Sequence, residues 1–404
     1  MTASREMERP AGSALEVFAA FLKLGLTSFG GPIAHLGYFR EEFVIRRGWF
    51  DDKSYADLVA LSQFLPGPAS SQVGFAIGLS RAGALGAAAA WTAFTLPSAI
   101  LLVLFAFGAS VLDGPAAEGV LHGLKLVAVA VVAQAVLGMA RSLTPDRWRA
   151  AIAVLAVVLV VAIGGAFGQV GAILAGGLLG LVLCRHVDAV GADDLHMPVS
   201  RGFGIGALVT FGALLVFLPL VAGLSQTLAV IDTFYRAGAL VFGGGHVVLP
   251  LLEAGTVEQG WLSPDTFLAG YGAAQAVPGP LFTFAAYLGA AAGPAPNGIF
   301  GGAIALVAVF VPGLLILLAA LPFWSQLRAV PEVQAGMRGA NAAVVGILGL
   351  ALYDPVFTSA VLSPADFALA LAGFVALVAW KAPPLAVVIA LAMVGGLLGF
   401  VAGA

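Results

Sequence analysis

The sequence predicts an all-α polytopic membrane protein. Of its 404 residues, 61% are hydrophobic and only 10% are charged, whereas soluble domains carry about 25% charged residues. The mean hydropathy is +1.04. Spanning a bilayer takes about 20 helical residues, and apolar stretches of that kind lie near residues 15–35, 55–80, 84–111, 119–140, 148–167, 168–184, 203–224, 230–252, 266–292, 298–321, 335–353, 366–380 and 384–403. They are too uniformly apolar for the alternating strands of a membrane barrel, so each is predicted to be helical.

The composition excludes several classes of protein. Eighteen basic and 21 acidic residues give a net charge of -3, so no basic field is present to bind nucleic acid. One cysteine, Cys184, cannot form an intramolecular disulfide, and the five histidines lack metal-ligand spacing. No lysine follows a glycine, so the chain has no P-loop for ATP. Because no nucleophile, acid or metal ligands cluster in the apolar stretches, the sequence predicts no enzyme, cofactor or metal site.

The chain repeats one pattern twice. Phe29-Gly30-Gly31 returns as Phe242-Gly243-Gly244, and Pro66-Gly67-Pro68 returns as Pro278-Gly279-Pro280. Other matched landmarks are Trp49 with Trp261, Pro97 with Pro312, and Gly123 with Gly339, and the offset drifts only from 212 to 219 along the chain. We therefore predict a cytoplasmic tail at 1–14, a first repeat at 15–185, a linker with one transmembrane helix at 186–229, and a second repeat at 230–404.

The two repeats are predicted to be inverted relative to each other in the membrane. About six spanning or re-entrant helices in each repeat return the chain to its starting side, and the linker helix near 203–224 then moves it across. Cytoplasmic loops are enriched in Lys and Arg. With the N-terminus in the cytoplasm, most basic residues fall inside, and the exceptions share one loop: Arg40, Arg46, Arg47 and Lys53. An alternative stays open, in which the segment around Pro66 enters the membrane and returns without crossing it. This loop would then be cytoplasmic, and the number of spans would change.

Three cationic residues lie inside apolar segments. Lys23 and Arg236 occupy the same repeat position, and Lys125 corresponds to Asn341. A charge at the bilayer centre costs about 2.5 to 3.5 kcal/mol on insertion scales, so it usually faces protein or water and marks a pathway. The competing interpretation is snorkelling to the surface, or a structural partner such as Glu16. Residues 58–112, 147–187 and 266–331 contain no Asp or Glu, so buried cations without buried anions favour a negatively charged solute.

The Phe-Gly-Gly and Pro-Gly-Pro motifs are predicted to break their helices, because proline removes a donor and glycine permits unusual backbone angles. Each break exposes a helix N-terminus, which attracts anions. Paired broken helices in inverted repeats are typical of the binding sites of transporters. The residues predicted to bind substrate are Lys23, Phe29, Gly30, Gly31, Gln63, Pro66, Gly67, Pro68, Ser70, Arg236, Phe242, Gly243, Gly244, Gln275, Pro278, Gly279, Pro280 and Thr283. Those predicted to line the pathway or couple transport are His35, Lys125, His246 and Asn341.

These motifs also carry a resemblance to a known family. The run from Phe29 to Leu36 with the break at 63–68, and the corresponding residues 242–246 and 275–280, resemble the two domains of the chromate ion transporter family, in its long-chain form. The resemblance covers nearly the whole chain. It implies a multi-pass protein of the bacterial inner membrane that exports chromate, with sulfate as a related tetrahedral oxyanion, and it implies that the Phe-Gly-Gly and Pro-Gly-Pro residues of both repeats form the family motif.

The predicted function is therefore secondary transport of an oxyanion by alternating access, driven by the membrane potential or by proton exchange. The main alternative is an oxyanion channel on the same scaffold, which differs by passing ions at rates that give measurable currents. The preferred anion, the coupling ion and the oligomeric state, monomer or homodimer, are left open by the sequence.

Overall fold

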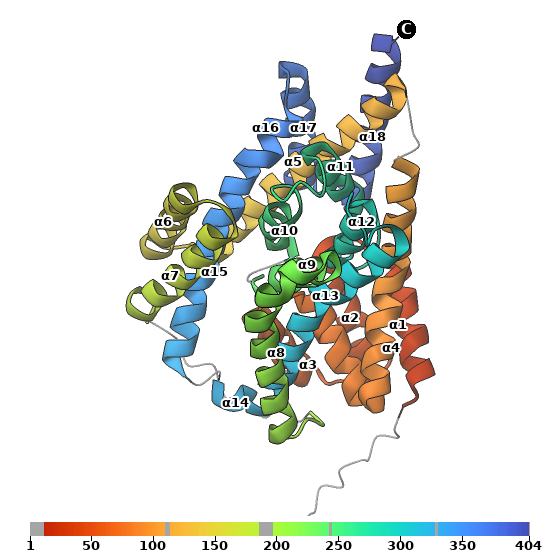
Figure 1. The fold of residues 1–404 in the computed structure, drawn as a ribbon. Helices are drawn as coiled ribbons and strands as arrows, with labels where there is room; N and C mark the ends of the chain where they lie inside the picture. The colour runs from red at the N-terminus through yellow and green to blue at the C-terminus, as the bar shows by residue number, and fades with distance from the viewer. Residues whose placement is uncertain (1–11, 110–113, 186–196, 242–244, 328–329, 404) are drawn as a thin grey trace, which may run out of the picture.

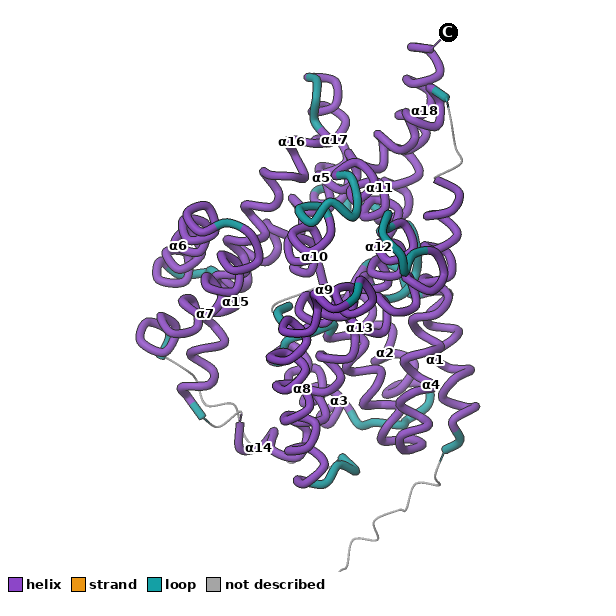
Figure 2. Tube along the Cα trace, in the orientation of Figure 1, coloured by secondary structure: helices purple, strands orange, loops and turns teal. Residues whose placement is uncertain are grey.

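The computed structural model describes residues 12–109, 114–185, 197–241, 245–327 and 330–403. Within these residues every regular element is a helix (Figures 1 and 2). Six of the helices are long and apolar enough to cross a membrane: Ala69–Ala109, Pro115–Leu143, Arg201–Leu224, Gly298–Leu327, Pro331–Ala360 and Pro384–Val401. The predicted all-α polytopic membrane fold is confirmed.

The α-helices of the first repeat are α1 (Ala14–Thr27), α2 (Gly31–Phe39), α3 (Asp52–Phe64), α4 (Ala69–Ala109), α5 (Pro115–Leu143), α6 (Arg147–Ile163) and α7 (Gly165–Leu183). The linker helix is α8 (Arg201–Val221). The second repeat holds α9 (Gln226–Ala239), α10 (Val248–Thr256), α11 (Pro264–Ala274), α12 (Phe284–Ala291), α13 (Gly298–Ala320), α14 (Trp324–Leu327), α15 (Pro331–Ala351), α16 (Thr358–Ala360), α17 (Pro364–Val378) and α18 (Pro384–Gly403). Short 3-10 or π turns extend some of them: η1 (Arg40–Arg46), η2 (Ala222–Leu224), η3 (Gly245–Val247), η4 (Leu281–Thr283), η5 (Leu321–Phe323) and η6 (Leu352–Phe357).

Four of the predicted spans are not continuous helices. Residues 15–35 divide into α1 and α2, residues 55–80 into α3 and the start of α4, residues 230–252 into α9 and α10, and residues 266–292 into α11 and α12. Each division falls at a Phe-Gly-Gly or Pro-Gly-Pro motif, as the chemistry of these residues predicts. In addition, α4 consists of two helices joined by non-helical residues at Ala82 and Gly83. Its halves fold back on each other, because Gly78 and Gly86 lie backbone to backbone.

The first two broken segments return to the face from which they start. Glu16, in the first turn of α1, accepts a salt bridge from Arg81 at 3.1 Å and lies 3.9 Å from Arg47, which follows η1. The start of α1, the end of η1 and the turn inside α4 therefore lie together. The expectation that Arg46 and Arg47 face the opposite side from the N-terminus is wrong, because a helix that breaks in the middle can turn back where a continuous helix must cross.

A network of ion pairs closes this corner of the molecule. Glu42 is buried and accepts hydrogen bonds from Arg46 and Arg47, each at 2.7 Å, and Lys23 lies 3.5 Å away. Burial raises the pKa of the Glu42 carboxyl, but the hydrogen bond from Arg47 and the surrounding cations outweigh burial and hold that pKa below its ordinary value. The Arg47 and Arg81 guanidinium groups also lie over the ring of Trp49, at 5.2 and 5.0 Å.

The two repeats interlock through their outer helices. In the first repeat α5 packs against α17 and α18 of the second, while α15 of the second packs against α6 and α7 of the first. The contacts fall at matched positions: the Cβ position of Gly123 lies 2.3 Å from the carbonyl oxygen of Leu391, and that of Gly339 lies 2.1 Å from the carbonyl oxygen of Gly176. Side chains larger than glycine cannot fit at such approaches, which are typical of membrane helix packing. The inversion of the repeats itself stays a prediction.

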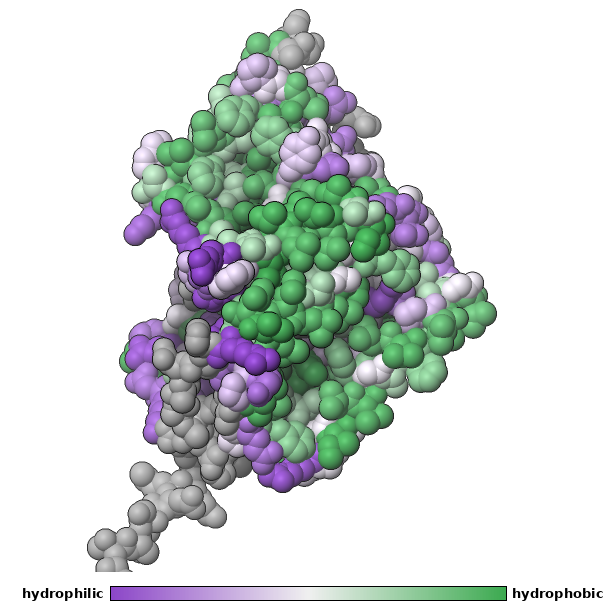
Figure 3. Space-filling view, turned by 90° about the vertical axis from the view of Figure 1, so that its left-hand side faces the viewer, coloured by the Kyte–Doolittle hydropathy of each residue, from purple (hydrophilic) through white to green (hydrophobic). Residues whose placement is uncertain are grey.

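The outer surface is predominantly apolar. Figure 3 shows the face that carries α6 and α7 in Figure 1, where hydrophobic residues cover a broad area and hydrophilic residues gather along the edges. Val161 and Phe167 at the α6–α7 turn are exposed. The linker helix α8 packs on α9 and α13 and otherwise exposes its apolar side chains. A surface of this kind is suited to contact with lipid tails.

Candidate functional site

The breaks of the two repeats meet at the centre of the molecule and bond to each other reciprocally. The backbone N–H of Gly67, in the first Pro-Gly-Pro motif, donates to the carbonyl oxygen of Val241 at 2.7 Å. The N–H of Gly279, in the second motif, donates to the carbonyl oxygen of Ser28 at 2.9 Å. Ser28 and Val241 each precede a Phe-Gly-Gly motif. Each Pro-Gly-Pro break is therefore tied to the Phe-Gly-Gly break of the other repeat.

Only glycine fits at the middle of each Pro-Gly-Pro motif. Gly67 and Gly279 have φ angles of +118° and +95°, which residues with a Cβ rarely adopt. A Cβ at Gly67 would lie 2.9 Å from the Cα of Gly313, and a Cβ at Gly279 would lie 2.9 Å from the Oγ of Ser98. These two neighbours directly follow Pro312 and Pro97, so the prolines matched in the sequence also occupy matched places in the structure.

The helix starts that the breaks create converge on one place. The Cβ position of Gly245, at the start of η3, lies 3.7 Å from the Cγ of Pro32 in α2 and 3.7 Å from the Cβ of Leu281 in η4. The Nδ1 of His35 in α2 lies 3.3 Å from the Oγ of Ser70 in the first turn of α4. The N-termini of these helices carry partial positive charge and free N–H groups. Their meeting point is an electropositive site built without a formal charge.

Buried polar atoms without a hydrogen-bond partner lie on the segments next to the breaks. Buried polar groups in native proteins are almost always hydrogen-bonded, so each exception calls for an explanation. These atoms include Ser28 Oγ, His35 Nε2, Ser62 Oγ, Ser71 Oγ, Gln72 Oε1, Thr95 Oγ1 and Gln275 Nε2, and α9 adds Gln226 Nε2, Asp232 Oδ1 and Arg236 Nε. Most of these groups can donate to an anion, and a polar ligand would satisfy them.

Other polar side chains at the breaks serve the protein itself. The Nε2 of Gln72 donates to the carbonyl oxygens of Pro66 and Gly313, at 2.9 and 2.8 Å, and so fixes the first Pro-Gly-Pro break against α13. The Oγ1 of Thr283 donates to the carbonyl oxygen of Pro280 at 2.8 Å. His246 lies 2.6 Å from the hydroxyl of Tyr271 through its Nδ1.

The structure places Lys23 and Arg236 beside carboxylates. Lys23 pairs with Glu42, and its side chain is 52% exposed. Arg236 pairs with Asp232 one turn earlier in α9. Both carboxylates are buried, so the expectation of buried cations without buried anions is wrong. The sequence did not show this because Glu42 reaches Lys23 only through the turn-back of the first segment. Contact of Lys23 or Arg236 with a substrate stays a prediction.

The remaining predicted residues divide between the centre and the periphery. Phe29, Gly30 and Gly31 form the first break, where Gly30 caps α2. Gln63 is exposed in the last turn of α3, and Gln275 caps the end of α11. Pro66, Pro68, Pro278 and Pro280 flank the glycines described above. Phe242, Gly243 and Gly244 lie outside the described residues. Sequence reasoning missed Ser28, Thr95 and Ser98, and the available signal for the last two was Pro97 beside them.

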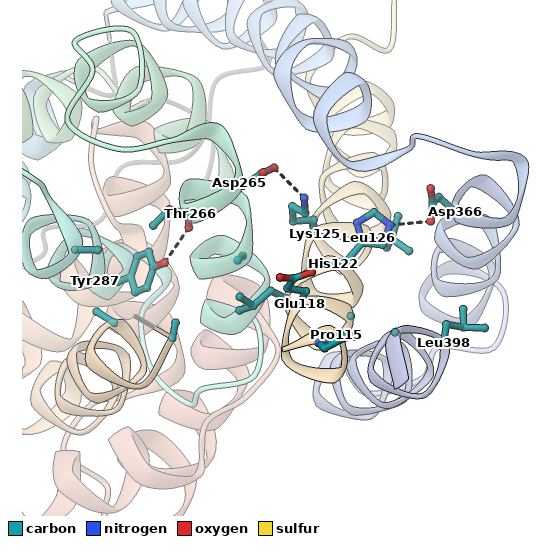
Figure 4. A pocket seen from close by; sticks show the side chains of 18 of the residues that line it. Pro115, Glu118, His122, Lys125, Leu126, Asp265, Thr266, Tyr287, Asp366 and Leu398 are labelled. Carbon is teal, nitrogen blue, oxygen red and sulfur yellow. Dashed lines mark hydrogen bonds and ion pairs between the residues drawn. The ribbon is translucent and has the colours of Figure 1, made fainter. Parts of the chain in front are cut away.

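A cavity of about 1230 Å³ lies apart from the breaks, between the ends of α4, α5, α11, α12, α17 and α18 (Figure 4). The ammonium of Lys125 pairs there with Asp265 at 2.8 Å, and His122 lies 2.7 Å from Asp366 through its Nε2. Glu118 also lines the cavity. None of the lining residues belongs to the four breaks. Because the carboxylates there outnumber the permanent cations, this cavity is poorly suited to hold a dianion.

The fold and the central site define a class. Paired broken helices whose N-termini meet inside an all-α membrane protein are the architecture of polytopic transporters. The family model described as chromate transporter matches this chain over residues 15–181 and again over 228–399. The protein belongs to the chromate transporter family.

Several curated proteins are similar over most of their length. A chromate transport protein of Pseudomonas aeruginosa is 30% identical over 98% of this chain and 94% of its own. A chromate transport protein of Cupriavidus metallidurans is 27% identical over 81% of this chain and 79% of its own. A probable chromate transport protein of Synechococcus elongatus is 28% identical over 84% of each chain. No solved structure matches.

Proposed function

We propose that this protein carries chromate, or a closely related tetrahedral oxyanion such as sulfate, out of the bacterial cell across the inner membrane by alternating access. The observation that carries the proposal is the set of buried, unpartnered polar atoms where the four broken segments meet. Hydroxyls, a histidine and helix N-termini together offer donors on several sides of a small anion. The family and the names of its relatives supply the substrate class.

The packing of the centre favours a carrier over a channel. Gly245 lies close to both Pro32 and Leu281 where the helix starts meet, so we expect that an anion has to separate these elements before it can pass. A channel needs an open path through both sides at once, whereas a carrier opens one side at a time. Packing of the breaks at the midpoint fits a carrier, in which at least one side is always closed.

We place the face that holds Glu16, Arg47 and Arg81 in the cytoplasm. This face collects the basic residues of the first two segments, and the short connection between α5 and α6 adds Arg141, Arg147 and Arg149 if α5 and the second half of α4 cross the membrane. Enrichment of basic residues marks the cytoplasmic side. With α6, α7 and α8 also crossing, the second repeat begins on the opposite face, as inverted repeats require.

The membrane potential supplies enough energy for efflux. Moving one charge through 100 mV is worth about 2.3 kcal/mol. Expelling a dianion at about 150 mV, inside negative, therefore yields about 7 kcal/mol, which supports a gradient on the order of 10⁵-fold. Proton exchange is a second possible coupling, for which His35 and His246 are candidate groups near the breaks.

The test is uptake of labelled chromate into inverted membrane vesicles under an imposed potential. Ser28→Ala and His35→Gln each remove a donor from the proposed site, and we expect each to raise the KM for chromate by about 10-fold, because a hydrogen bond to a charged group contributes about 1.5 to 3 kcal/mol. Ser142→Ala is the matched control, since Ser142 is exposed at the far end of α5 and donates to Gly138.

Two outcomes would contradict the proposal. Wild-type vesicles that accumulate no more chromate than vesicles without the protein would exclude the substrate. Equal KM values in Ser28→Ala, His35→Gln and wild type would move the binding site away from the breaks. Competition by sulfate in the same assay ranks the affinities of the two anions. A steady ionic current, with a chromate flux that is not accelerated by chromate on the opposite side, would favour the channel.

A further inference from the structure

Helices α3 and α11 occupy the same position in the two repeats and begin in the same way. Asp51 caps α3 by accepting from the N–H of Ser54, and Ser263 caps α11 by accepting from the N–H of Thr266. Each helix then runs into its Pro-Gly-Pro break. The offset of 212 residues between the two caps is the offset of the motifs themselves. The register of the two helices is therefore fixed, and their residues can be compared one by one.

The burial of the two helices differs along one face. On α3 the side chains of Ala56, Ala60 and Gln63 are exposed, and their spacing places them on one stripe. The corresponding residues of α11 are Leu268 and Gly272, which are buried, and Gln275, which is half-buried. Two copies of one helix are thus covered on one side of the molecule and uncovered on the other.

The cover of α11 is α5 of the first repeat. The Cβ position of Gly272 lies 2.1 Å from the carbonyl oxygen of Leu124 in α5, so the two backbones touch. In the first turn of α11, Asp265 pairs with Lys125 of α5 at 2.8 Å (Figure 4). A close glycine contact and an ion pair hold α11 against α5.

The repeat counterpart of α5 is α15, which offers a complementary surface to α3. At the positions of Leu124 and Lys125, α15 carries Ala340 and Asn341. The Oδ1 of Asn341 is buried and has no hydrogen-bond partner. At the position of Asp265, α3 carries Lys53. An ammonium group on α3 therefore corresponds to an unpartnered amide acceptor on α15, and both helices carry small residues nearby, the exposed Ala60 and the buried Ala340.

We infer that the structure shows one end state of a reciprocal gate, in which α3 seats on α15 when α11 leaves α5. The inference rests on the proposed function, because the exchange of the two seated helices is what opens one face and closes the other. In the present state α11 is seated, and the uncovered stripe of α3 lies on the side of Arg47 and Arg81. With that side in the cytoplasm, this is the state that accepts an anion from inside the cell.

The two seats differ in strength. The α5–α11 seat is held by a charge pair, whereas the α3–α15 seat would be held by a hydrogen bond from Lys53 to the neutral amide of Asn341. A hydrogen bond between two ionised groups is stronger than one to a neutral partner. The gate is therefore biased at rest toward the state with α11 seated, and a bound anion is needed to drive the exchange.

The test uses cysteine cross-linking in membranes with the natural Cys184 replaced by Ala. One double variant carries Lys125→Cys and Asp265→Cys, and the second carries Lys53→Cys and Asn341→Cys. The first variant lacks the ion pair but keeps the close contact of Gly272 with Leu124, so with a short bifunctional maleimide we expect the first pair to react at rest. During chromate flux under an imposed potential, reaction of the first pair should fall and that of the second should rise at least threefold. Cross-linking of the first pair should also stop chromate flux.

The matched control is the double variant Lys53→Cys with Lys125→Cys. In the proposed gate these two positions lie near opposite faces of the membrane in both states, so they should never cross-link. The inference is overturned if the second pair stays unreactive while the same variant, before reagent, moves chromate. Should that variant fail to reach the membrane, single Asn341→Cys protein is labelled with an impermeant maleimide, and equal labelling with and without chromate overturns the inference as well. The vesicles could also show reciprocal cross-linking that follows the potential while moving no chromate. That result would support the reciprocal gate and contradict chromate as the substrate.

Discussion

At the centre of the molecule, Ser28, His35 and Thr95 bury polar atoms that have no partner, whereas in the cavity beside α5 and α11 the ammonium of Lys125 and the ring of His122 each meet a carboxylate. The central groups are neutral and fixed by the breaks. Each of these peripheral groups is instead paired with a carboxylate. On the proposed function, the central groups replace the hydration shell of the anion, whereas the peripheral pairs hold helices together.

A neutral site has an advantage for a dianion that must leave again. Conduction and transport require binding strong enough to admit the ion and weak enough to release it. Helix N-termini and hydroxyls supply donors without the full countercharge that would trap a dianion in a medium of low dielectric constant. The carboxylate partners of Lys23 and Arg236 fit this view, because each offsets the charge of its cation.

The largest expected effect breaks the central region directly. Gly67→Ala or Gly279→Ala introduces a Cβ at a φ angle of +118° or +95° and at 2.9 Å from its neighbour. We expect chromate flux to fall at least about 10-fold, because an unfavourable left-handed residue costs about 1–2 kcal/mol before any clash is counted. Vesicle flux and the thermal midpoint in detergent are the measurements.

The matched control for these variants is Gly83→Ala. Gly83 also has a positive φ angle, of +62°, but a Cβ there meets no atom within 4 Å. It carries the backbone strain without the contact between repeats. If Gly83→Ala reduces flux as much as Gly67→Ala does, the reciprocal bonds at the centre are not what matters.

A smaller effect is expected in the cavity, and it should differ in kind. Lys125→Met breaks the pair with Asp265 but removes no donor from the breaks. We expect the turnover of chromate to change by about 3- to 10-fold with little change in KM, because a positively charged partner on α5 contributes about 1 to 2 kcal/mol across a partly buried pair. Lys125→Arg should restore most of the wild-type turnover. A change confined to KM would assign Lys125 to the substrate site instead.

The smallest effect on flux is expected at the ion-pair network of Glu42, because this network stabilises the fold at the face that holds Arg46 and Arg47. The pKa of Glu42 is lowered in the folded protein from its ordinary value of 4.5, so its contribution to stability is present above that value and is lost as the pH falls through the lowered pKa. We expect Glu42→Gln to reduce this acid-dependent loss, while flux at neutral pH stays within about twofold of wild type. Thermal midpoints measured from pH 7 down to pH 3 provide the test, and an unchanged pH profile would show that another carboxyl is responsible.

The helix breaks were predictable because their cause is local. Glycine and proline alter the backbone wherever they stand, so the motifs at 29–31, 66–68 and 278–280 mark their breaks in the sequence and in the structure alike. The repeat was predictable for the same reason, since matched landmarks need no knowledge of contacts.

The rest depends on contacts between distant segments. Whether a broken segment crosses or returns is decided by partners such as Glu16 and Arg81, which lie 65 residues apart. The unpartnered hydroxyls of Ser28 and Thr95 look like ordinary serine and threonine until their burial is known. The unequal cover of α3 and α11 belongs to one state of the protein, and no sequence pattern distinguishes one state from another.

The interlocking of the two repeats bears on how the chain is made. Helix α5 is covered by α18 (Pro384–Gly403), which is synthesised after all the other helices described above. Until then, a glycine-lined groove on the first half stands open within the bilayer. Synthesis must therefore deliver α18 before the first half can close, and a chain that stops before α18 would leave the first half as unfinished as the second.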